Sequence, residues 1–185
     1  MPPTLEALLE PLRHSPQLVE AVDKLQEQIR EERQRRERFY EEMTPEQKIE
    51  FIDGEVVLHS PARNAHLDVT LSLAVLLKTF VESRQLGEVK TEKCLCVFPR
   101  NDYEPDIVFF GREKAARFGD HTMKFPLPDL IIEVLSSSTE KRDRGVKFED
   151  FQAHGVGEYW IVDAERSTIE QYICLLYTSP SPRDS

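Results

Sequence analysis

One continuous apolar run constrains the fold of this chain more than any other feature. Residues Leu130 to Leu135 read LIIEVL, and every position except Glu133 is apolar. A strand with one solvated face alternates apolar and polar residues, whereas an unbroken run predicts a strand covered on both faces. A carboxylate inside such a strand is costly to bury unless a cation meets it. Glu133 is therefore the first residue that needs a partner.

Turn and helix signals around this run predict an α/β domain over residues 45–173. The pair Asp53-Gly54 predicts a tight hairpin turn between two short strands. The segment AHLDVTLSLAVLLKTFVESR predicts a long helix that is apolar on most sides and hence deeply packed. A second helix is predicted from Thr139 to about His154, and further short apolar segments predict strands. Together these elements predict a mixed sheet flanked by helices.

The two ends of the chain are predicted to lie outside this domain. In residues 1–44, apolar side chains recur at helical spacings of four, three and four, at Leu18, Val22, Leu25 and Ile29. This stripe predicts a helical extension of the coiled-coil type that packs on the domain or forms a homodimer with a second copy. Residues 174–185 read CLLYTSPSPRDS, which translates a nucleotide string similar to a sequencing adapter. We expect this tail to be adapter-derived and the domain to be C-terminally truncated; the alternative is a Ser/Pro-rich disordered tail.

Charge and composition limit the partners. The net charge of −10 argues against tight, indiscriminate binding to nucleic acid. A contact with DNA must therefore be local, and the densest basic cluster predicts it at Lys141, Arg142 and Arg144. No run with the length of a membrane span and no signal peptide is recognised, so we expect a cytoplasmic protein without a membrane partner. Cys94 and Cys96 alternate on one predicted strand, which favours small buried residues over a zinc site.

Two carboxylates are candidates for a metal site. Asp106 begins the apolar strand of EPDIVFF, and Glu133 lies in the next predicted strand. Adjacent strands stand about 4.8 Å apart, so two carboxylates on one face can share a divalent ion, of which Mg²⁺ (or Mn²⁺) suits hard oxygen ligands. Lys147 in the following helix has a stem long enough to return toward Glu133. Glu55 and His66 lie on either side of the start of the long helix and complete the predicted catalytic set.

This set of groups suits phosphodiester hydrolysis, although each residue also has a structural explanation. A metal ion polarises the phosphate and lowers the pKa of the attacking water, and a lysine neutralises developing charge. Alternatively, Asp106 caps a strand entry and Glu133 forms a structural ion pair with an internal lysine or arginine. Lys147 and Glu55 would then be solvated, and His66 would be a helix cap or a core histidine.

The segments IDGEVVLHSP, EPDIVFF and PDLIIEVLSSSTEKRDRGVKFEDFQAHGVGEYWIVD together resemble the Uma-two family of restriction-endonuclease-like proteins over residues 48–173. The resemblance implies the PD-(D/E)XK nuclease fold with Asp106 and Glu133 as metal ligands. It also implies a lysine two residues after Glu133, where this chain has Leu135, and Lys147 is the candidate for a relocated lysine. The predicted function is a Mg²⁺-dependent endonuclease that hydrolyses DNA. The alternatives are a catalytically inactive nucleic-acid-binding or regulatory domain of the same fold, and a structural protein that acts through its helical extension.

Overall fold

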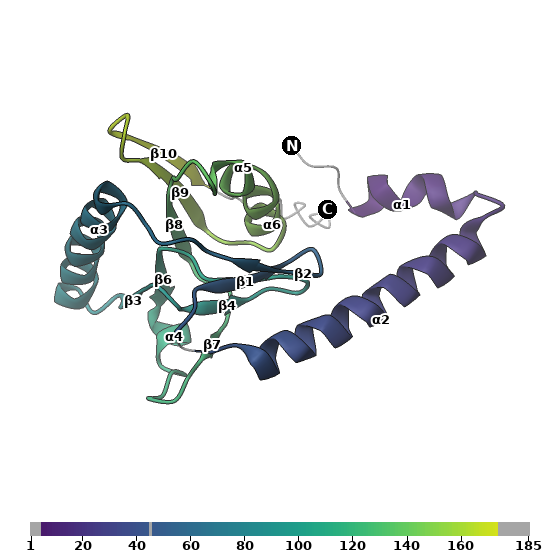
Figure 1. The fold of residues 1–185 in the computed structure, drawn as a ribbon, viewed down its shortest axis with the longest axis horizontal. Helices are drawn as coiled ribbons and strands as arrows, with labels where there is room; N and C mark the ends of the chain where they lie inside the picture. Colours follow the sequence, from purple (N-terminus) through teal and green to yellow (C-terminus); the bar gives the residue numbers. More distant parts are fainter. Residues whose placement is uncertain (1–4, 45, 174–185) are drawn as a thin grey trace, which may run out of the picture.

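The computed structural model describes residues 5–44 and 46–173, and the predicted adapter-derived tail lies outside these ranges. Within them, two five-stranded sheets form one folded body flanked by helices (Figure 1). Sheet A has the strand order β2-β1-β5-β4-β7, and sheet B has the order β10-β9-β8-β6-β3. In each sheet one pair is parallel, β4–β7 in sheet A and β8–β9 in sheet B, and the other pairs are antiparallel. The prediction of mixed β-sheet flanked by helices is confirmed, but the strands form two mixed sheets where the sequence predicted one.

The strands of sheet A are β1 (Ile49–Ile52), β2 (Glu55–Leu58), β4 (Leu95–Val97), β5 (Asp102–Tyr103) and β7 (Lys124–Phe125). The strands of sheet B are β3 (Gly87–Thr91), β6 (Ile107–Gly111), β8 (Leu130–Val134), β9 (Glu158–Asp163) and β10 (Thr168–Ile173). The helices are α1 (Leu5–Arg13), α2 (Leu18–Glu42), α3 (Asn64–Ser83), α4 (Arg112–Ala115), α5 (Glu140–Arg142), the π-helical turn η1 (Asp143–Lys147) and α6 (Phe148–Ala153).

Strand β8 lies in the middle of sheet B, and all five of its residues are buried. Ile131 belongs to a core cluster with Phe151 of α6 on one face of the sheet. Ile132 belongs to a second cluster with Ala74 and Val81 of α3 on the other face. Figure 1 shows α3 and the α5–α6 segment on opposite sides of this sheet. The prediction of a strand covered on both faces is confirmed.

Helix α3 forms where it was predicted, but the prediction that it is deeply packed is wrong. Its buried residues are Thr70, Ala74 and Val81, which face sheet B. The opposite face is exposed and apolar, and it carries Leu67, Leu71, Val75, Leu76 and Phe80. By length and composition alone, α3 could also cross a membrane, contrary to the expectation that no run has that length. This is weak evidence for a span, because the other face of α3 packs against sheet B.

The helix predicted from Thr139 to His154 is kinked. It is divided into α5, η1 and α6, and the backbone leaves helical geometry at Gly145, where φ is −110° and ψ is −108°. Local π-helical turns of this kind are frequent at functional sites. The kink matters here because η1 carries Asp143 and Lys147, both of which are buried.

The C-terminal half of α2 packs on sheet A. Phe39 is buried against Phe51 and Leu95 of sheet A. The guanidinium of Arg36 donates to both carboxylate oxygens of Asp102 at 2.6 Å. The predicted domain boundary at residue 44 therefore stays a prediction, because the extension shares a core with residues on the other side of it.

Two smaller predictions are confirmed. Asp53 and Gly54 form the turn between β1 and β2 with φ of 51° and 82°, as a primed hairpin turn requires. Cys94 and Cys96 are free and lie buried in the core cluster that includes Ile131 and Phe151.

Candidate active site

The strand register brings Asp106 and Glu133 together. Strands β6 and β8 are antiparallel with Ile107 opposite Ile132, so Asp106, directly before β6, lies opposite Glu133. Residues opposite each other in an antiparallel pair project to the same face of the sheet. Both side chains are buried, and Asp106 Oδ2 accepts a hydrogen bond from the backbone N–H of Val134 at 2.9 Å. The two carboxylates therefore share one face, as the sequence predicted.

Lys147 occupies the centre of a group of carboxylates. Its Nζ lies 2.8 Å from Glu133 Oε1 and 2.9 Å from Glu50 Oε1. A third carboxylate, Asp143, lies 3.5 Å away at Oδ1. The side chain of Lys147 is 2% exposed, so the alternative of a solvated lysine is wrong. Lys147 reaches back from η1 to Glu133, and its ammonium is the cationic partner of this buried carboxyl group.

Strand β1 contributes two charged residues that the sequence analysis missed. Lys48 directly precedes β1 and donates from Nζ to Asp106 Oδ1 at 2.7 Å. Glu50, two residues later, reaches Lys147, accepts a hydrogen bond from the backbone N–H of Glu104 and contacts His59 Nε2 at 2.9 Å. Residues two apart in a strand share a face. The signal was present in the sequence as charged residues flanking Ile49 in an otherwise apolar strand, the same signal that singled out Glu133.

The other two predicted residues behave differently from each other. His66, near the start of α3, has Nε2 at 3.4 Å from Asp106 Oδ1, and its Nδ1 is buried with no hydrogen-bond partner. Glu55 is exposed at the first position of β2, opposite Ile52. The structure thus brings His66 into the cluster and leaves Glu55 outside it; within the hairpin, Glu50 is the glutamate that reaches the site.

The acids of the cluster titrate in opposite directions. Burial would raise the pKa of Glu50, but the charge of Lys147 and the contact with His59 outweigh it and lower this pKa to about 2. Burial raises the pKa of Glu133 well above its usual range, and nearby Asp106 and Asp143 add to this effect against the attraction of Lys147. Three carboxyl groups around one ammonium cannot all be ionised at low cost. Glu133 is the group that holds a proton most readily.

The lysine itself stays charged. Burial would lower the pKa of Lys147, but Glu133, Glu50 and Asp143 outweigh burial and raise it well above its ordinary value. Likewise, the pKa of Asp106 is lowered although burial opposes it, because His66 and Lys48 stabilise the carboxylate. Lys147 is therefore a fixed positive charge at neutral pH, and not a proton acceptor.

The cluster contains the donor atoms that a divalent cation prefers, but not the geometry of a formed metal site. Four buried carboxyl groups, at Glu50, Asp106, Glu133 and Asp143, face two lysines, so the cluster has acids in excess. Hard carboxylate oxygens are the ligands of Mg²⁺ and Mn²⁺. Asp143 Oδ1, like His66 Nδ1, is buried without a hydrogen-bond partner. Within the described ranges, however, no group of three or more His, Cys, Asp or Glu side chains is already arranged around an ion position.

The predicted DNA-contacting residues lie beside the cluster but differ in availability. Lys141 is exposed on α5. Arg144 already donates to both oxygens of Glu170, at 2.6 and 3.0 Å, and contacts Glu140. Arg142 is half-buried, and its Nε is buried without a partner. Of the three, Lys141 is the cation with the greatest freedom to meet a phosphate.

Fold and cluster together define a class of protein. Two acidic positions face each other in adjacent central strands of a mixed sheet that is covered by helices on both faces, which is a restriction endonuclease-like fold. The fold matches the crystal structure of "a putative nuclease belonging to DUF820" from Anabaena variabilis with a TM-score of 0.67 and 20% sequence identity. The match covers 75% of this chain and 78% of the other. At this identity, the likeness shows the fold.

The sequence comparison identifies the family. The model of the Uma2 family, described as "Putative restriction endonuclease", matches residues 32–174, and the chain belongs to this family. A relative from Synechocystis sp. (strain ATCC 27184 / PCC 6803 / Kazusa), named "Uncharacterized protein sll1609", is 30% identical over 129 residues. That alignment covers 68% of this chain and 72% of the relative. The resemblance recognised from the sequence motifs is confirmed.

Proposed function

We propose that this chain is a metal-dependent nuclease that hydrolyses phosphodiester bonds in DNA at the cluster around Glu133. The observation that carries the proposal is the placement of Asp106 opposite Glu133 in adjacent central strands, with the ammonium of Lys147 at 2.8 Å from Glu133. A structural ion pair explains one carboxylate and one lysine. It does not explain why four carboxyl groups and Lys147 are buried together, with the partly exposed Lys48 beside them, at the expense of desolvation.

Asp106 and Glu133 would hold the ion, Mg²⁺ or Mn²⁺. When bound, such an ion polarises the scissile phosphate and lowers the pKa of a water nucleophile. The residues of the chain prepare the site: Lys48 and the Val134 N–H fix the two oxygens of Asp106, at 2.7 and 2.9 Å. To hold the ion, Glu133 would have to be deprotonated, as a carboxylate metal ligand must be.

Lys147 supplies positive charge to the reaction. Because its pKa is raised by three carboxylates, it stabilises negative charge that develops on the phosphate and does not act as a base. Glu50, in β1 of sheet A, contacts the ammonium at 2.9 Å and helps to hold it in place. This arrangement supports the relocation of the motif lysine from the position of Leu135 to η1.

The substrate would approach from the side of Lys48 and His66. Their side chains are 24% and 14% exposed, against 2% for Lys147, so they form the most accessible border of the cluster. The contact of His66 with Asp106 raises the pKa of the imidazole, although burial and Lys48 oppose it. Both groups can therefore be cationic when a phosphate arrives, which supports an anionic substrate.

A second candidate function is a nucleic-acid-binding or regulatory domain without catalysis. It is favoured by the burial of Lys147, whose ammonium is fully engaged by carboxylates, and by Leu135 at the position of the motif lysine. In this case the lysine replaces the metal ion as the counter-charge of Glu133.

A cleavage assay separates the two functions. Supercoiled plasmid, single-stranded DNA and RNA are incubated with the chain and Mg²⁺, Mn²⁺ or EDTA. We expect metal-dependent cleavage of DNA, loss of cleavage in Glu133→Gln, and no change in Glu149→Gln, which alters an exposed acid on α6. No cleavage by the folded wild-type chain under any condition would favour the non-catalytic domain, and cleavage that survives Glu133→Gln would rule out this site.

A further inference from the structure

Helix α2 presents one face with two different environments. Large side chains recur along it at alternating spacings of four and three residues, at Leu18, Val22, Leu25, Ile29, Glu32, Arg36, Phe39 and Met43. The second half of this series is engaged by the domain: Glu32 pairs with Arg100, and Phe39 is buried. The first half continues in the same register beyond the domain, and its four apolar side chains are 36% to 48% exposed.

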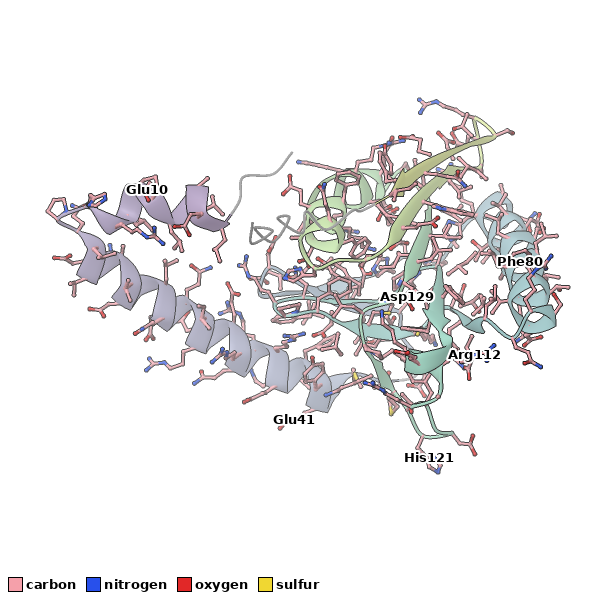
Figure 2. All side chains as sticks on the ribbon, turned by 180° about the vertical axis from the view of Figure 1, so that it is seen from behind. Glu10, Glu41, Phe80, Arg112, His121 and Asp129 are labelled. Carbon is pink, nitrogen blue, oxygen red and sulfur yellow. The ribbon has the colours of Figure 1, made fainter. Side chains whose placement is uncertain are left out.

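Helix α1 adds a second exposed stripe to this arm. Its leucines recur at i, i+3, i+4 and i+7, at Leu5, Leu8, Leu9 and Leu12, and none of the residues of α1 is buried. The two helices form a hairpin, but their apolar faces do not bury each other. Figure 1 shows α1 and the first half of α2 extending away from the sheets, and Figure 2 shows their side chains with open space around them.

Such an arm is not stable as an isolated element. Most of the stability of a helix comes from tertiary packing of its amphipathic face, and isolated short helices are marginal in water. Contiguous exposed apolar surface of this kind marks an interaction site. The same face of α2 already packs against the domain through Phe39 and Met43. The exposed stripe on the first half of α2 therefore continues an existing interface.

The charges of the residues beside the apolar stripe of α2 indicate which kind of partner it can bind. The residues that flank it on α2 are neutral, at Val19, Ala21, Gln26 and Gln28, so two copies can pair about a two-fold axis without like-charge repulsion. The outer face carries acids at Glu20, Asp23 and Glu27, whereas a membrane-surface helix or a nucleic-acid arm needs mainly basic residues there. A protein partner with the same neutral flanks is therefore favoured.

We propose that residues 5–29 form a homodimer, in which two α1–α2 hairpins pack their leucine stripes into a four-helix bundle. Each hairpin provides two amphipathic helices with unburied apolar faces, and a bundle of two hairpins buries all four. The family match begins at residue 32, where α2 first meets the domain, so the dimerising segment lies outside the matched region. The inference does not depend on the proposed nuclease activity.

The test measures the mass of the full chain by sedimentation equilibrium or light scattering at micromolar concentrations. The wild-type chain should have twice the protomer mass of 21.5 kDa. The double variant with Val22→Glu and Leu25→Glu should be a monomer. Its denaturation midpoint, measured by the fluorescence of Trp160 in the sheet domain, should be the same as that of the wild-type chain. The control Lys24→Glu changes the net charge by the same amount on the outer face of α2 and should remain a dimer.

Two further variants keep the test decisive. Val22→Ala with Leu25→Ala preserves charge and does not lower helix propensity, and it should raise the dissociation constant of the dimer at least tenfold even if the glutamate pair disturbs folding. Leu71→Glu with Leu76→Glu places charges on the exposed face of α3 and should leave the dimer intact. A monomeric wild-type chain, an alanine pair with unchanged affinity, or dissociation by the α3 pair alone would each overturn the proposal.

Discussion

Replacing Lys147 by methionine gives the most demanding test of how the cluster is held together. The change keeps most of the side-chain volume and removes the ammonium that lies 2.8 Å from Glu133, 2.9 Å from Glu50 and 3.5 Å from Asp143. Three buried carboxyl groups then lose their shared cation. Removing one partner from a buried ion pair costs about 3–5 kcal/mol of unfolding free energy, and we expect a loss in this range at neutral pH.

The loss should depend on pH in a defined direction. Without Lys147, burial raises the folded-state pKa of the remaining acids above their unfolded values, as it already does for Glu133 and Asp143. A carboxyl group with a raised folded pKa binds more protons in the folded state, so stability increases as the pH falls toward the unfolded pKa and decreases as the pH rises. The deficit of Lys147→Met should therefore shrink by about 1.4 kcal/mol per pH unit for each proton taken up.

Urea denaturation followed by circular dichroism and by the fluorescence of Trp160 measures this deficit at about pH 7 and about pH 5. The control Lys141→Met removes an exposed lysine from α5 and should change stability by no more than about 0.5 kcal/mol. Equal stability of Lys147→Met and the wild-type chain at neutral pH would refute the buried network. A deficit that is the same at both pH values would refute the assignment of the pH dependence to the carboxyl groups.

Three other predictions follow from the same structure. Asp102→Ala leaves the guanidinium of Arg36 without its two 2.6 Å bonds, and urea denaturation should show a loss of about 3 kcal/mol. Gly54→Ala should cost about 1 kcal/mol or more, because φ is +82° and a Cβ would lie 2.9 Å from other side-chain atoms; Gly119→Ala, with nothing within 4 Å, serves as its control in the same assay. The affinity for Mn²⁺ should fall as the pH is lowered, beginning above the usual carboxylate range because the pKa of Glu133 is raised; calorimetry showing no change between neutral and mildly acidic pH would contradict this.

The sequence predicted the central part of the site because its signals are local. The unbroken apolar run around Glu133 required a buried strand, and Asp106 began the strand with which it pairs. Lys147 could be assigned because the motif resemblance implied a lysine relocated to the following helix, and its stem is long enough to return toward Glu133. Glu50 was overlooked in favour of Glu55, although the charged residues beside Ile49 carry the same local signal as Glu133, because β1 is only four residues long and the contact of Glu50 with Lys147 joins segments far apart in the chain.

The remaining features depend on contacts between distant segments. The predicted helix from Thr139 to His154 carried no clear marker of its kink, since Gly145 also allows a straight helix. The packing of α2 rests on Arg36 and Asp102, which are 66 positions apart, and no spacing rule connects them. Composition predicted burial of α3 on most sides, but only the face toward sheet B has a covering partner within the described chain.

Binding of Mn²⁺ to the folded chain, measured by isothermal titration calorimetry, tests the central claim most directly. Asp106 and Glu133 should jointly hold the ion, so Asp106→Asn and Glu133→Gln should each weaken binding at least about tenfold, while the exposed Glu55→Gln and Glu149→Gln should bind as the wild-type chain does. Equal affinity of the wild-type, Asp106→Asn and Glu133→Gln chains would contradict the account, because the ion would then be held elsewhere. Loss of binding in Glu55→Gln would place an exposed residue of β2 in the site and contradict the geometry described above.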